Sequence, residues 1–355
     1  MTAPLSPGAT IGIFGSGQLG RMLAIAAARL GLQTHIYAPT GHESPAAQVA
    51  TTFTTGAYDN TERVTEFVKS CDVVTYEFEN IPAETAQLAS TFTPLLPSAE
   101  CLDVSQDRLT EKTFISTQAQ VPVAPFEAVS TLSDVKRVLK TMNGKCVLKT
   151  RRFGYDGKGQ AVISNETEAE EAWNTLGHVP IIAEAFIPFQ REVSIVCARS
   201  VDKQTAAYPL IENVHQNHIL HTSTAPTHQK TEDAHKLAIK IMDKLDYVGV
   251  MATEFFELED GSLIVNEIAP RVHNSGHWTQ DAGCTDQFEQ HIRAVAGWPL
   301  GSTTPLHKVE MTNLIGQDIE DWQDFASKDK TFLHFYGKKE ARDGRKMGHI
   351  NRIIS

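Results

Sequence analysis

Residues 149–160 constrain the fold most, because they join an apolar strand carrying a lysine to a hairpin rich in glycine. The expected strand covers residues 146–150 and includes Lys149, and the hairpin has three closely spaced glycines: Gly154, Gly157 and Gly159. The pattern G-x-x-x-x-G-K-[ST] does not occur, so the phosphates of a nucleotide need another cradle than a Walker-type loop. A solvated hairpin tip explains the glycines. A lid whose amides close over a triphosphate explains the lysine as well, and the segment alone supports both interpretations about equally.

Two carboxylates farther along the chain are predicted to lie on neighbouring strands. Residues 249–258 carry Glu254, residues 262–268 carry Glu267, and a tight turn joins the two strands. Side chains of matching parity would share one face, where two carboxylates repel each other unless a cation neutralises them. Mg²⁺ prefers carboxylate oxygens and substrate phosphates, so this pair and the amide of Asn266 form a candidate Mg²⁺–ATP site. The alternative is that one carboxylate faces solvent.

The N-terminal region predicts a doubly wound α/β domain. A strand at residues 11–14, a G-x-G-x-x-G loop from Gly15 to Gly20, a helix to about residue 30 and a strand at 33–38 form a βαβ unit. An NAD site normally places an acidic residue after the second strand, and residues 36–40 contain none. NAD and NADP are therefore not expected to bind. The loop amides suit a phosphate of the substrate instead.

Bulk properties exclude several classes of protein. A net charge of −11 argues against broad binding to nucleic acid, which requires clustered Lys and Arg. The five cysteines are scattered and form no C-x-x-C pair, so neither a disulfide framework nor a structural zinc site is expected. The sequence shows no signal peptide and no apolar run of membrane-spanning length. These features predict a cytoplasmic protein without nucleic-acid or membrane partners.

Three further segments complete the prediction. Ser105 is expected to cap a helix that begins there. His273 and His277 are four residues apart, which on a helix would allow zinc, but Ser275 and the glycine after it favour a loop. Arg271 is then an anion ligand. The tail from residue 307 onward is polar and rich in turns, and its basic cluster is either a solvated face or a phosphate site: Lys338, Arg342, Arg345 and Lys346.

Several motifs together span nearly the whole chain, among them residues 76–80, 107–112, 153–160 and 266–277. In this order they resemble the ATP-grasp superfamily and, within it, the N5-carboxyaminoimidazole ribonucleotide synthetases. The resemblance implies an α/β (α+β) ATP-grasp fold with three domains. These are a doubly wound pre-ATP-grasp domain at residues 1–104, a linker helix and small lid domain at 105–183, and an ATP-clasping domain with the basic tail loop at 184–355.

The resemblance also implies a reaction. ATP phosphorylates bicarbonate to carboxyphosphate, and the exocyclic amine of aminoimidazole ribonucleotide takes the carboxyl group. ATP and Mg²⁺ would be the cofactors, and such proteins are usually homodimers. Rival hypotheses are another ATP-grasp ligase, such as a formate-using glycinamide ribonucleotide transformylase, and a nucleotide-binding protein without catalysis.

The matching motifs imply roles for individual residues. Those expected to contact ATP are Arg108, Lys149, Gly154, Tyr155, Asp156, Gly157, Lys158, Gly159, Gln160, Glu184, Ala185, Phe186, Ile187, Glu192, His215, Asn266 and Glu267. Those expected to hold the ribonucleotide are Gln18, Leu19, Glu79, Asn274, Lys338, Arg345 and Lys346. The expected Mg²⁺ ligands are Glu254 and Glu267. Those expected where bicarbonate and the amine meet are Tyr155, Asp156, Lys158, Arg271 and His273.

Overall fold

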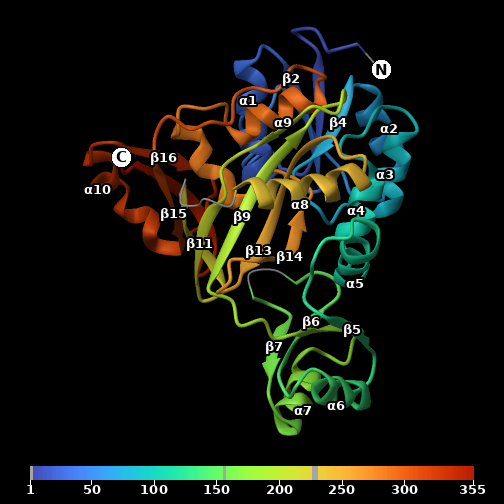
Figure 1. The fold of residues 1–355 in the computed structure, drawn as a ribbon. Helices are drawn as coiled ribbons and strands as arrows, with labels where there is room; N and C mark the ends of the chain where they lie inside the picture. Colours follow the sequence, from blue (N-terminus) through green and yellow to red (C-terminus); the bar gives the residue numbers. More distant parts are fainter. Residues whose placement is uncertain (1–2, 155–156, 226–230) are drawn as a thin grey trace.

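The computed structural model describes residues 3–154, 157–225 and 231–355 and contains a parallel sheet at its N-terminus (Figure 1). Its strand order is β3-β2-β1-β4, as a doubly wound domain requires. The elements are β1 (Thr10–Phe14), α1 (Gln18–Arg29), β2 (Gln33–Ala38), β3 (Thr52–Thr55), α2 (Thr61–Lys69), β4 (Val73–Tyr76) and α3 (Ala83–Ser90). The predicted βαβ unit is confirmed, and β2 has the predicted bounds.

Short helical segments connect this sheet to the rest of the chain: α4 (Ala99–Ser105), α5 (Arg108–Thr113) and a π-helical turn, η1 (Phe114–Gln118). The prediction that Ser105 caps a helix is wrong, because Ser105 ends α4. The cap of α5 is Asp107, whose Oδ1 accepts hydrogen bonds from the amides of Leu109 and Thr110 at 2.9 and 3.2 Å. A carboxylate at this position satisfies two amides that the helix itself leaves free.

A small antiparallel sheet with two helices forms a separate lobe at the bottom of Figure 1. Its strand order is β5-β8-β6-β7. The elements are β5 (Phe126–Val129), α6 (Leu132–Thr141), β6 (Cys146–Thr150), β7 (Gln160–Ile163), α7 (Glu166–Thr175) and β8 (Ile181–Ala185). Val135 and Val138 of α6 and Trp173 of α7 pack on Leu148 of β6 in a core of its own.

A nine-stranded sheet, antiparallel in all its pairs, makes up the body of the molecule. Its order is β14-β13-β9-β11-β12-β15-β17-β16, with β10 beside β9. The strands are β9 (Arg191–Arg199), β10 (Thr205–Ala207), β11 (Ile211–Gln216), β12 (Ile219–Ala225), β13 (Gly249–Glu257), β14 (Leu263–Ala269), β15 (Val309–Ile315), β16 (Thr331–Phe335) and β17 (Lys346–Ile353). The α-helices are α8 (Thr231–Lys244), α9 (Gln287–Val295) and α10 (Trp322–Ser327), and the 3-10 segments are η2 (Asn274–Asp281) and η3 (Gly316–Asp321).

One expectation for this region is wrong and another is incomplete. The tail after residue 307, predicted to be polar and rich in turns, also supplies three strands of the large sheet. The stretch around Ser275 is a 3-10 helix rather than a loop, and His273 is its N-cap.

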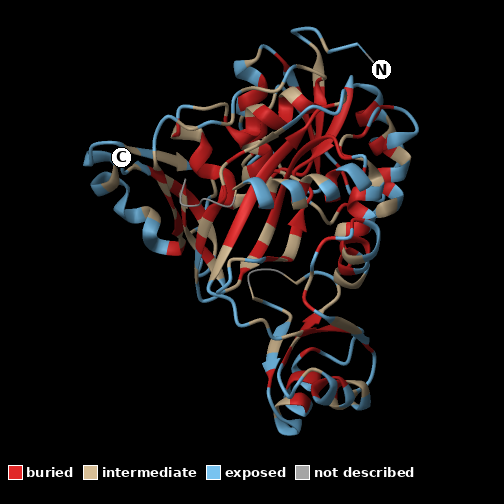
Figure 2. Ribbon diagram, in the orientation of Figure 1, coloured by how far each residue is buried: buried red, intermediate tan, exposed pale blue. Residues whose placement is uncertain are grey.

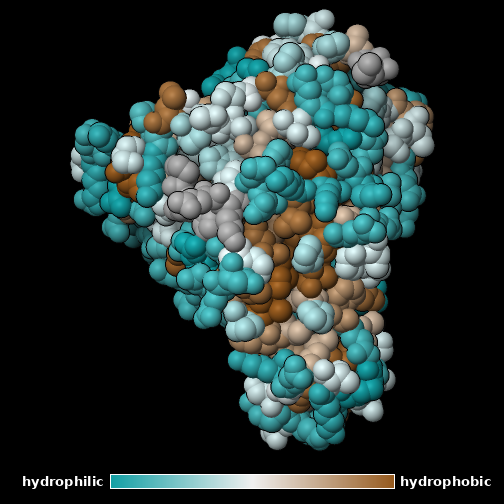
Figure 3. All heavy atoms as spheres, in the orientation of Figure 1, coloured by the Kyte–Doolittle hydropathy of each residue, from teal (hydrophilic) through white to brown (hydrophobic). Residues whose placement is uncertain are grey.

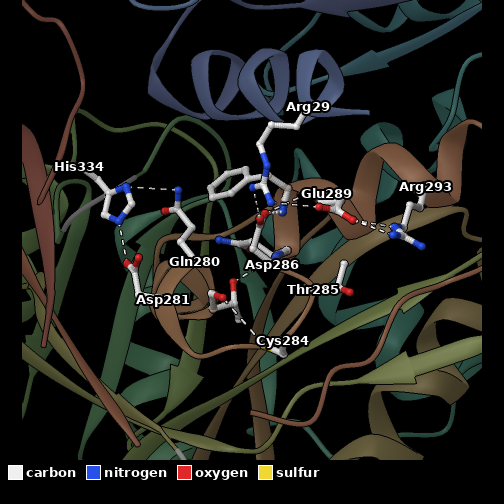
Figure 4. A network of polar contacts seen from close by, with 12 residues as sticks. Arg29, Gln280, Asp281, Cys284, Thr285, Asp286, Glu289, Arg293 and His334 are labelled. Atoms are coloured by element: carbon white, nitrogen blue, oxygen red, sulfur yellow. Dashed lines mark hydrogen bonds and ion pairs between the residues drawn. The ribbon is translucent and has the colours of Figure 1, made fainter. Parts of the chain in front are cut away.

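Polar contacts fix the N-terminal sheet layer to the large sheet beside η2 (Figure 4). Arg29 of α1 lies 3.2 Å from the carboxylate of Asp286 and 3.5 Å from that of Glu289, and Glu289 also pairs with Arg293 at 2.8 Å. Asp286 is also the N-cap of α9, so one carboxylate caps the start of a helix and joins two layers. The loop between η2 and α9 is thereby held against α1.

Burial follows this layering. The strands of the N-terminal and large sheets are mostly buried, and the outer helical faces are exposed (Figure 2). On the face drawn in Figure 3, apolar residues gather in the middle, where the small lobe joins the body, and hydrophilic residues cover most of the rest. Among the described residues no helix is both long and apolar enough to cross a membrane.

Candidate active site

The predicted carboxylate pair lies at one edge of the large sheet, on β13 and the edge strand β14. Glu254 of β13 and Glu267 of β14 are direct partners across the two strands, so their side chains share a face. Arg108 of α5 donates to Glu267 Oε2 at 2.7 Å. Burial opposes the charged form of Glu267, but Arg108 outweighs it and lowers the pKa of that carboxyl to about 2.

Glu254 has a different environment. Its Oε1 lies 3.4 Å from Nε2 of His273, a ring that burial, and then Arg271, keep neutral by lowering its pKa to about 3. Burial, and then the charge of Glu267, raise the pKa of Glu254 to about 8. The pair therefore carries one firmly held charge and one carboxyl that keeps its proton near neutral pH.

A third buried carboxylate, which the sequence analysis missed, supports the pair from α5. Glu111 Oε1 accepts a hydrogen bond from the amide of Ile268 at 2.6 Å, next to Glu267 on β14. Burial, and then Glu267, raise the pKa of Glu111 to about 8. Its position three residues after Arg108 places both on one face of α5, and that spacing was the available signal.

Two lysines converge on Glu184 of β8. Lys149 of β6 lies with Nζ 3.1 Å from Glu184 Oε2 and 3.4 Å from Oδ1 of Asn266. Lys112 of α5, which was not predicted, places its Nζ 3.3 Å from the same carboxylate oxygen. Burial disfavours the charge of Glu184, but the two lysines outweigh it and lower its pKa. The structure thus brings Lys149, Glu184 and Asn266 together beside the carboxylate pair.

The glycine hairpin lies over the turn between β11 and β12. Gly157 has φ +76°, and a Cβ there would lie 2.3 Å from the Cβ of His218. The amide of Thr150 donates to the carbonyl of Gly159 at 2.7 Å, which closes the base of the hairpin where Gln160 begins β7. Tyr155 and Asp156 lie outside the described residues. Gly154 and Lys158 flank them in the same hairpin.

The remaining expected nucleotide contacts lie on β9 and β11 and at the end of β8. Glu192 of β9 lies 3.1 Å from Nδ1 of His215 on β11. Burial works against a charge on His215, but Glu192 outweighs it and raises the pKa of the ring. Ala185 ends β8, Ile187 lies two residues later, and the Phe186 ring between them lies 3.5 Å from the Lys145 ammonium.

A second polar cluster lies where α1 meets the large sheet. Glu79 pairs with Arg271 at 2.6 Å. Glu77, which the sequence analysis passed over, accepts hydrogen bonds from the amides of Gly17 and Gly20 at 2.7 and 3.3 Å. Two amides of the glycine loop therefore already donate to a carboxylate of the protein, so not all amides of this loop are available to a ligand phosphate.

The first residues of α1 and η2 border this cluster. Gln18 and Leu19 lie between the two amides that contact Glu77. Asn274 begins η2, and both polar atoms of its side chain are buried without a hydrogen-bond partner among the described residues. A buried amide that lacks partners within the protein is costly, which makes Asn274 a candidate ligand-binding residue.

The basic tail loop reaches the same cluster. Lys338 Nζ donates to the carbonyl of Lys346 at 2.6 Å, and Arg345 Nη1 donates to the carbonyl of Glu340 at 2.9 Å. Lys338 is close enough to favour the charged form of Glu77, whose pKa burial raises. Arg342 instead forms an ion pair with Glu340 and is largely exposed.

The two histidines considered for zinc have separate partners. His277 Nδ1 lies 2.9 Å from the side-chain amide of Gln287, whereas His273 contacts Glu254. Within residues 3–154, 157–225 and 231–355, no group of three or more His, Cys, Asp or Glu side chains is arranged to hold a metal ion.

Comparison with known proteins agrees with this arrangement. Residues 8–106 match the ribonucleotide synthetase preATP-grasp domain, 114–288 the ATP-grasp domain, and 310–355 the phosphoribosylaminoimidazole carboxylase C-terminal domain. A Brucella melitensis N5-carboxyaminoimidazole ribonucleotide synthase is 48% identical, with 98% of this chain and 97% of that protein covered. The Bacillus subtilis protein of the same name is 42% identical, with 97% and 91% covered.

Solved structures agree as well. The Staphylococcus aureus N5-carboxyaminoimidazole synthetase complexed with ADP has a TM-score of 0.95 at 36% identity and covers 100% of this chain and 95% of that chain. The Aspergillus clavatus N5-carboxyaminoimidazole synthase with ADP and 5-aminoimidazole ribonucleotide has a TM-score of 0.91 at 29% identity, with 98% and 94% covered. Fold and matches together define the chain as an ATP-grasp protein. Within that class, it belongs to the family of N5-carboxyaminoimidazole ribonucleotide synthases.

Proposed function

We propose that this chain carboxylates 5-aminoimidazole ribonucleotide with bicarbonate at the expense of ATP, as one step of purine biosynthesis. ATP phosphorylates bicarbonate and leaves as ADP. The exocyclic amine of the ribonucleotide then attacks the carboxyphosphate, phosphate leaves, and N5-carboxyaminoimidazole ribonucleotide forms. Membership of its family makes the chain an ATP-dependent ligase. Relatives solved with ADP, with ATP, and with ADP and the ribonucleotide support both ligands.

Burial and charge support a nucleotide between the small and large sheets. Lys149 and Arg108 would face its phosphates, with the hairpin amides of Gly154, Gly157 and Gly159 above them. Glu184 to Ile187 would meet the adenine, and Glu192 with His215 the ribose. Water must be excluded because carboxyphosphate hydrolyses readily, and a glycine lid over the phosphates serves that purpose.

The carboxylate pair suits Mg²⁺. Glu254 and Glu267 are directly opposed and partly buried, and among the described residues no cationic group lies as close to Glu254 as Arg108 does to Glu267. A divalent ion held by the two carboxylates beside Asn266, with nucleotide phosphates as its other ligands, would relieve that repulsion. Bound there, Mg²⁺ would neutralise charge on the phosphoryl group during transfer.

The second cluster suits the ribonucleotide and bicarbonate. Asn274 supplies a side-chain amide that has no hydrogen-bond partner among the described residues. Gln18 and Leu19 lie at the N-terminal end of α1, and Glu79 lies beside Arg271. The tail loop would bind the 5′-phosphate through Lys338, Arg345 and Lys346. Arg271 and the neutral His273 would orient bicarbonate between the two ligands, with Tyr155, Asp156 and Lys158 closing from the lid. Asp156 would orient the amine or accept its proton.

The observation that carries the proposal is the coincidence of the carboxylate pair, the two lysines on Glu184 and the unpartnered Asn274 in one region of a family member. The test is phosphate release from ATP with bicarbonate and the ribonucleotide supplied separately and together. We expect full rate only with both, and a product that decomposes to the starting ribonucleotide on acidification. Release that requires formate in place of bicarbonate would overturn the proposal.

Three assignments accompany this function. We propose that the chain works as a homodimer in the cytoplasm, with domains at residues 1–104, 105–183 and 184–355. The usual assembly of the family supports the dimer, and the separate core of the small lobe supports its division from the rest of the chain. Sedimentation at micromolar concentration tests the assembly, and a mass of one chain would contradict it.

A further inference from the structure

Lys112 is a fully buried lysine that the expected nucleotide contacts do not include. Its side chain has no exposed surface, and it projects from α5 four residues after Arg108. The ammonium lies 3.3 Å from Oε2 of Glu184 and 3.3 Å from the carbonyl of Val265. A buried charge is costly unless it is paired, so this ammonium requires both partners.

The two contacts of Lys112 lie on different sheets. Glu184 belongs to β8 of the small sheet, and Val265 belongs to β14 of the large sheet, two residues before Glu267. The amide of Val265 also donates to the carbonyl of Pro122 at 2.9 Å, ahead of β5. Lys112 therefore lies at the junction of the two sheets between which the nucleotide is expected.

The two carboxylate oxygens of Glu184 differ in their contacts. Lys112 and Lys149 both contact Oε2, at 3.3 and 3.1 Å. The other oxygen, Oε1, is buried and has no hydrogen-bond partner among the described residues. Two ammonium groups on one oxygen fix the rotamer of the carboxylate and leave Oε1 as a free acceptor in a site where an unmet acceptor is costly.

We propose that Lys112 is a positioning residue for the nucleotide: it holds Glu184 by Oε2, so that Glu184 Oε1 and the Lys149 ammonium stay placed for ATP. This inference rests on the proposed function, because it takes the nucleotide site from there. Burial lowers the pKa of Lys112, and the charge of Glu184 works against that effect.

The test measures ADP and ribonucleotide affinity by calorimetry for the wild type, Lys112→Met, Glu184→Gln and the double variant. Lys112→Met should weaken ADP about tenfold or more, the loss expected for a charge-assisted contact, and change ribonucleotide affinity less than about twofold. In the Glu184→Gln background the same change should alter ADP affinity less than about twofold, because residues that act through one contact are not additive. At saturating ATP, the kcat of Lys112→Met should stay near that of the wild type.

Arg199→Met is the matched control. Arg199 is also a buried cation of the large sheet, paired with Asp243 at 3.1 Å, but it lies at the end of β9 opposite to Glu192. The Arg199→Met change should lower the melting temperature and leave ADP affinity unchanged. If Lys112→Met does not fold, Lys112→Gln, which keeps a donor, replaces it with the same expectations.

Unchanged ADP affinity in the folded Lys112 variant, or full additivity with Glu184→Gln, would overturn the inference. Equal losses of ADP and ribonucleotide affinity would also overturn it, because they indicate a merely structural role. ADP titration needs no turnover. A wild type that binds ADP but shows no bicarbonate-dependent phosphate release would therefore refute the proposed reaction and not this inference.

Discussion

At the scale of single residues, Glu254 and Glu267 face each other across two strands but differ in charge. Of the two carboxylates, Glu267 is the one paired with Arg108, which is the main cause of its lowered pKa, whereas burial and then Glu267 raise the pKa of Glu254. Neutral His273 beside Glu254 adds no compensating charge. These features support the proposed Mg²⁺ site, in which the ion would displace the proton of Glu254 on binding.

Glu267→Gln should abolish ATP turnover and leave the fold intact. The change removes one anionic ligand of the proposed metal and leaves Arg108 without its charge partner. Phosphate release at saturating Mg²⁺ and circular dichroism check the two parts of this prediction. Glu310→Gln is the control, because Glu310 pairs with Arg352 on another strand and should retain activity. Near wild-type release by the Glu267 variant would show that it is not a metal ligand.

Mg²⁺ affinity should rise with pH. The pKa of Glu254 is raised to about 8, so below pH 8 a proton competes with the metal, and above pH 8 the site is already ionised. One competing proton predicts that Mg²⁺ binding to the ADP complex strengthens about tenfold between pH 7 and pH 9, mostly below pH 8. Calorimetric titration at several pH values measures this change.

Two variants test whether Glu254 causes the pH dependence of Mg²⁺ affinity. Glu254→Gln should bind Mg²⁺ weakly and lose the pH dependence. Glu111→Gln removes the other carboxyl of similar pKa and should keep that dependence, because Glu111 contacts a backbone amide instead of facing Glu254. A wild type whose Mg²⁺ affinity stays constant across the range would contradict the assignment.

The residues that sequence reasoning found are those with a local signal. Lys149 was visible because a lysine interrupts an apolar strand, and the carboxylate pair because a tight turn fixes the register. Glu77 and Lys112 gave no such signal, and Glu111 offered only its spacing of three residues from Arg108. Their partners are an amide of α1, an amide of β14 and a carboxylate of β8, and only tertiary packing brings these together.

At the scale of secondary structure, the strands predicted at residues 11–14, 33–38, 146–150, 249–258 and 262–268 are present, whereas the predicted helix cap is not. β2 and β6 have the predicted bounds because their apolar runs end sharply. Ser105 and Asp107 are both good caps, and packing selected Asp107, whose carboxylate also pairs with Arg151 at 2.7 Å. The tail strands β15, β16 and β17 were missed because their polar residues pair within the sheet, as His334 does with His349.

The lid hairpin should tolerate no side chain at position 157. An added Cβ at Gly157 meets His218, and the residue already has a positive φ. Gly157→Ala should therefore raise the KM for ATP and lower kcat, because the hairpin can no longer rest on the β11–β12 turn. Steady-state phosphate release measures both constants.

Gly144→Ala separates the clash from the backbone effect. Gly144 has φ +77° and no atom within 4 Å of the added Cβ, so it should lose only about 1–2 kcal/mol of stability and keep its kinetics. Adding His218→Gly to Gly157→Ala should restore activity, because the clash is with the His218 Cβ. If both alanine variants behave alike, the contact with His218 has no role in turnover.

At the scale of the whole molecule, the chain brings segments from its two ends to one place. α1 is near the N-terminus, and the loop before β17 is near the C-terminus, yet Lys338 influences Glu77 beside α1. The Gln48 amide also donates to the carbonyl of Gly337 at 2.9 Å. The small lobe lies at the opposite end of the molecule from α1 (Figure 1). The two substrates are thus expected to depend on different parts of the chain.

Arg345→Ala and Lys149→Ala should each affect the binding of a different substrate. Loss of one charge-assisted contact to a phosphate costs about 1.5–3 kcal/mol, roughly a ten- to hundred-fold loss of affinity. Arg345→Ala should raise the KM for the ribonucleotide and leave that for ATP nearly unchanged, and Lys149→Ala should do the reverse. Arg342→Ala, in the same loop but paired with Glu340, should change neither constant. Steady-state kinetics with each substrate varied decides the matter. If Arg345→Ala weakens ATP instead, or matches the Arg342 control, the tail loop does not bind the ribonucleotide phosphate.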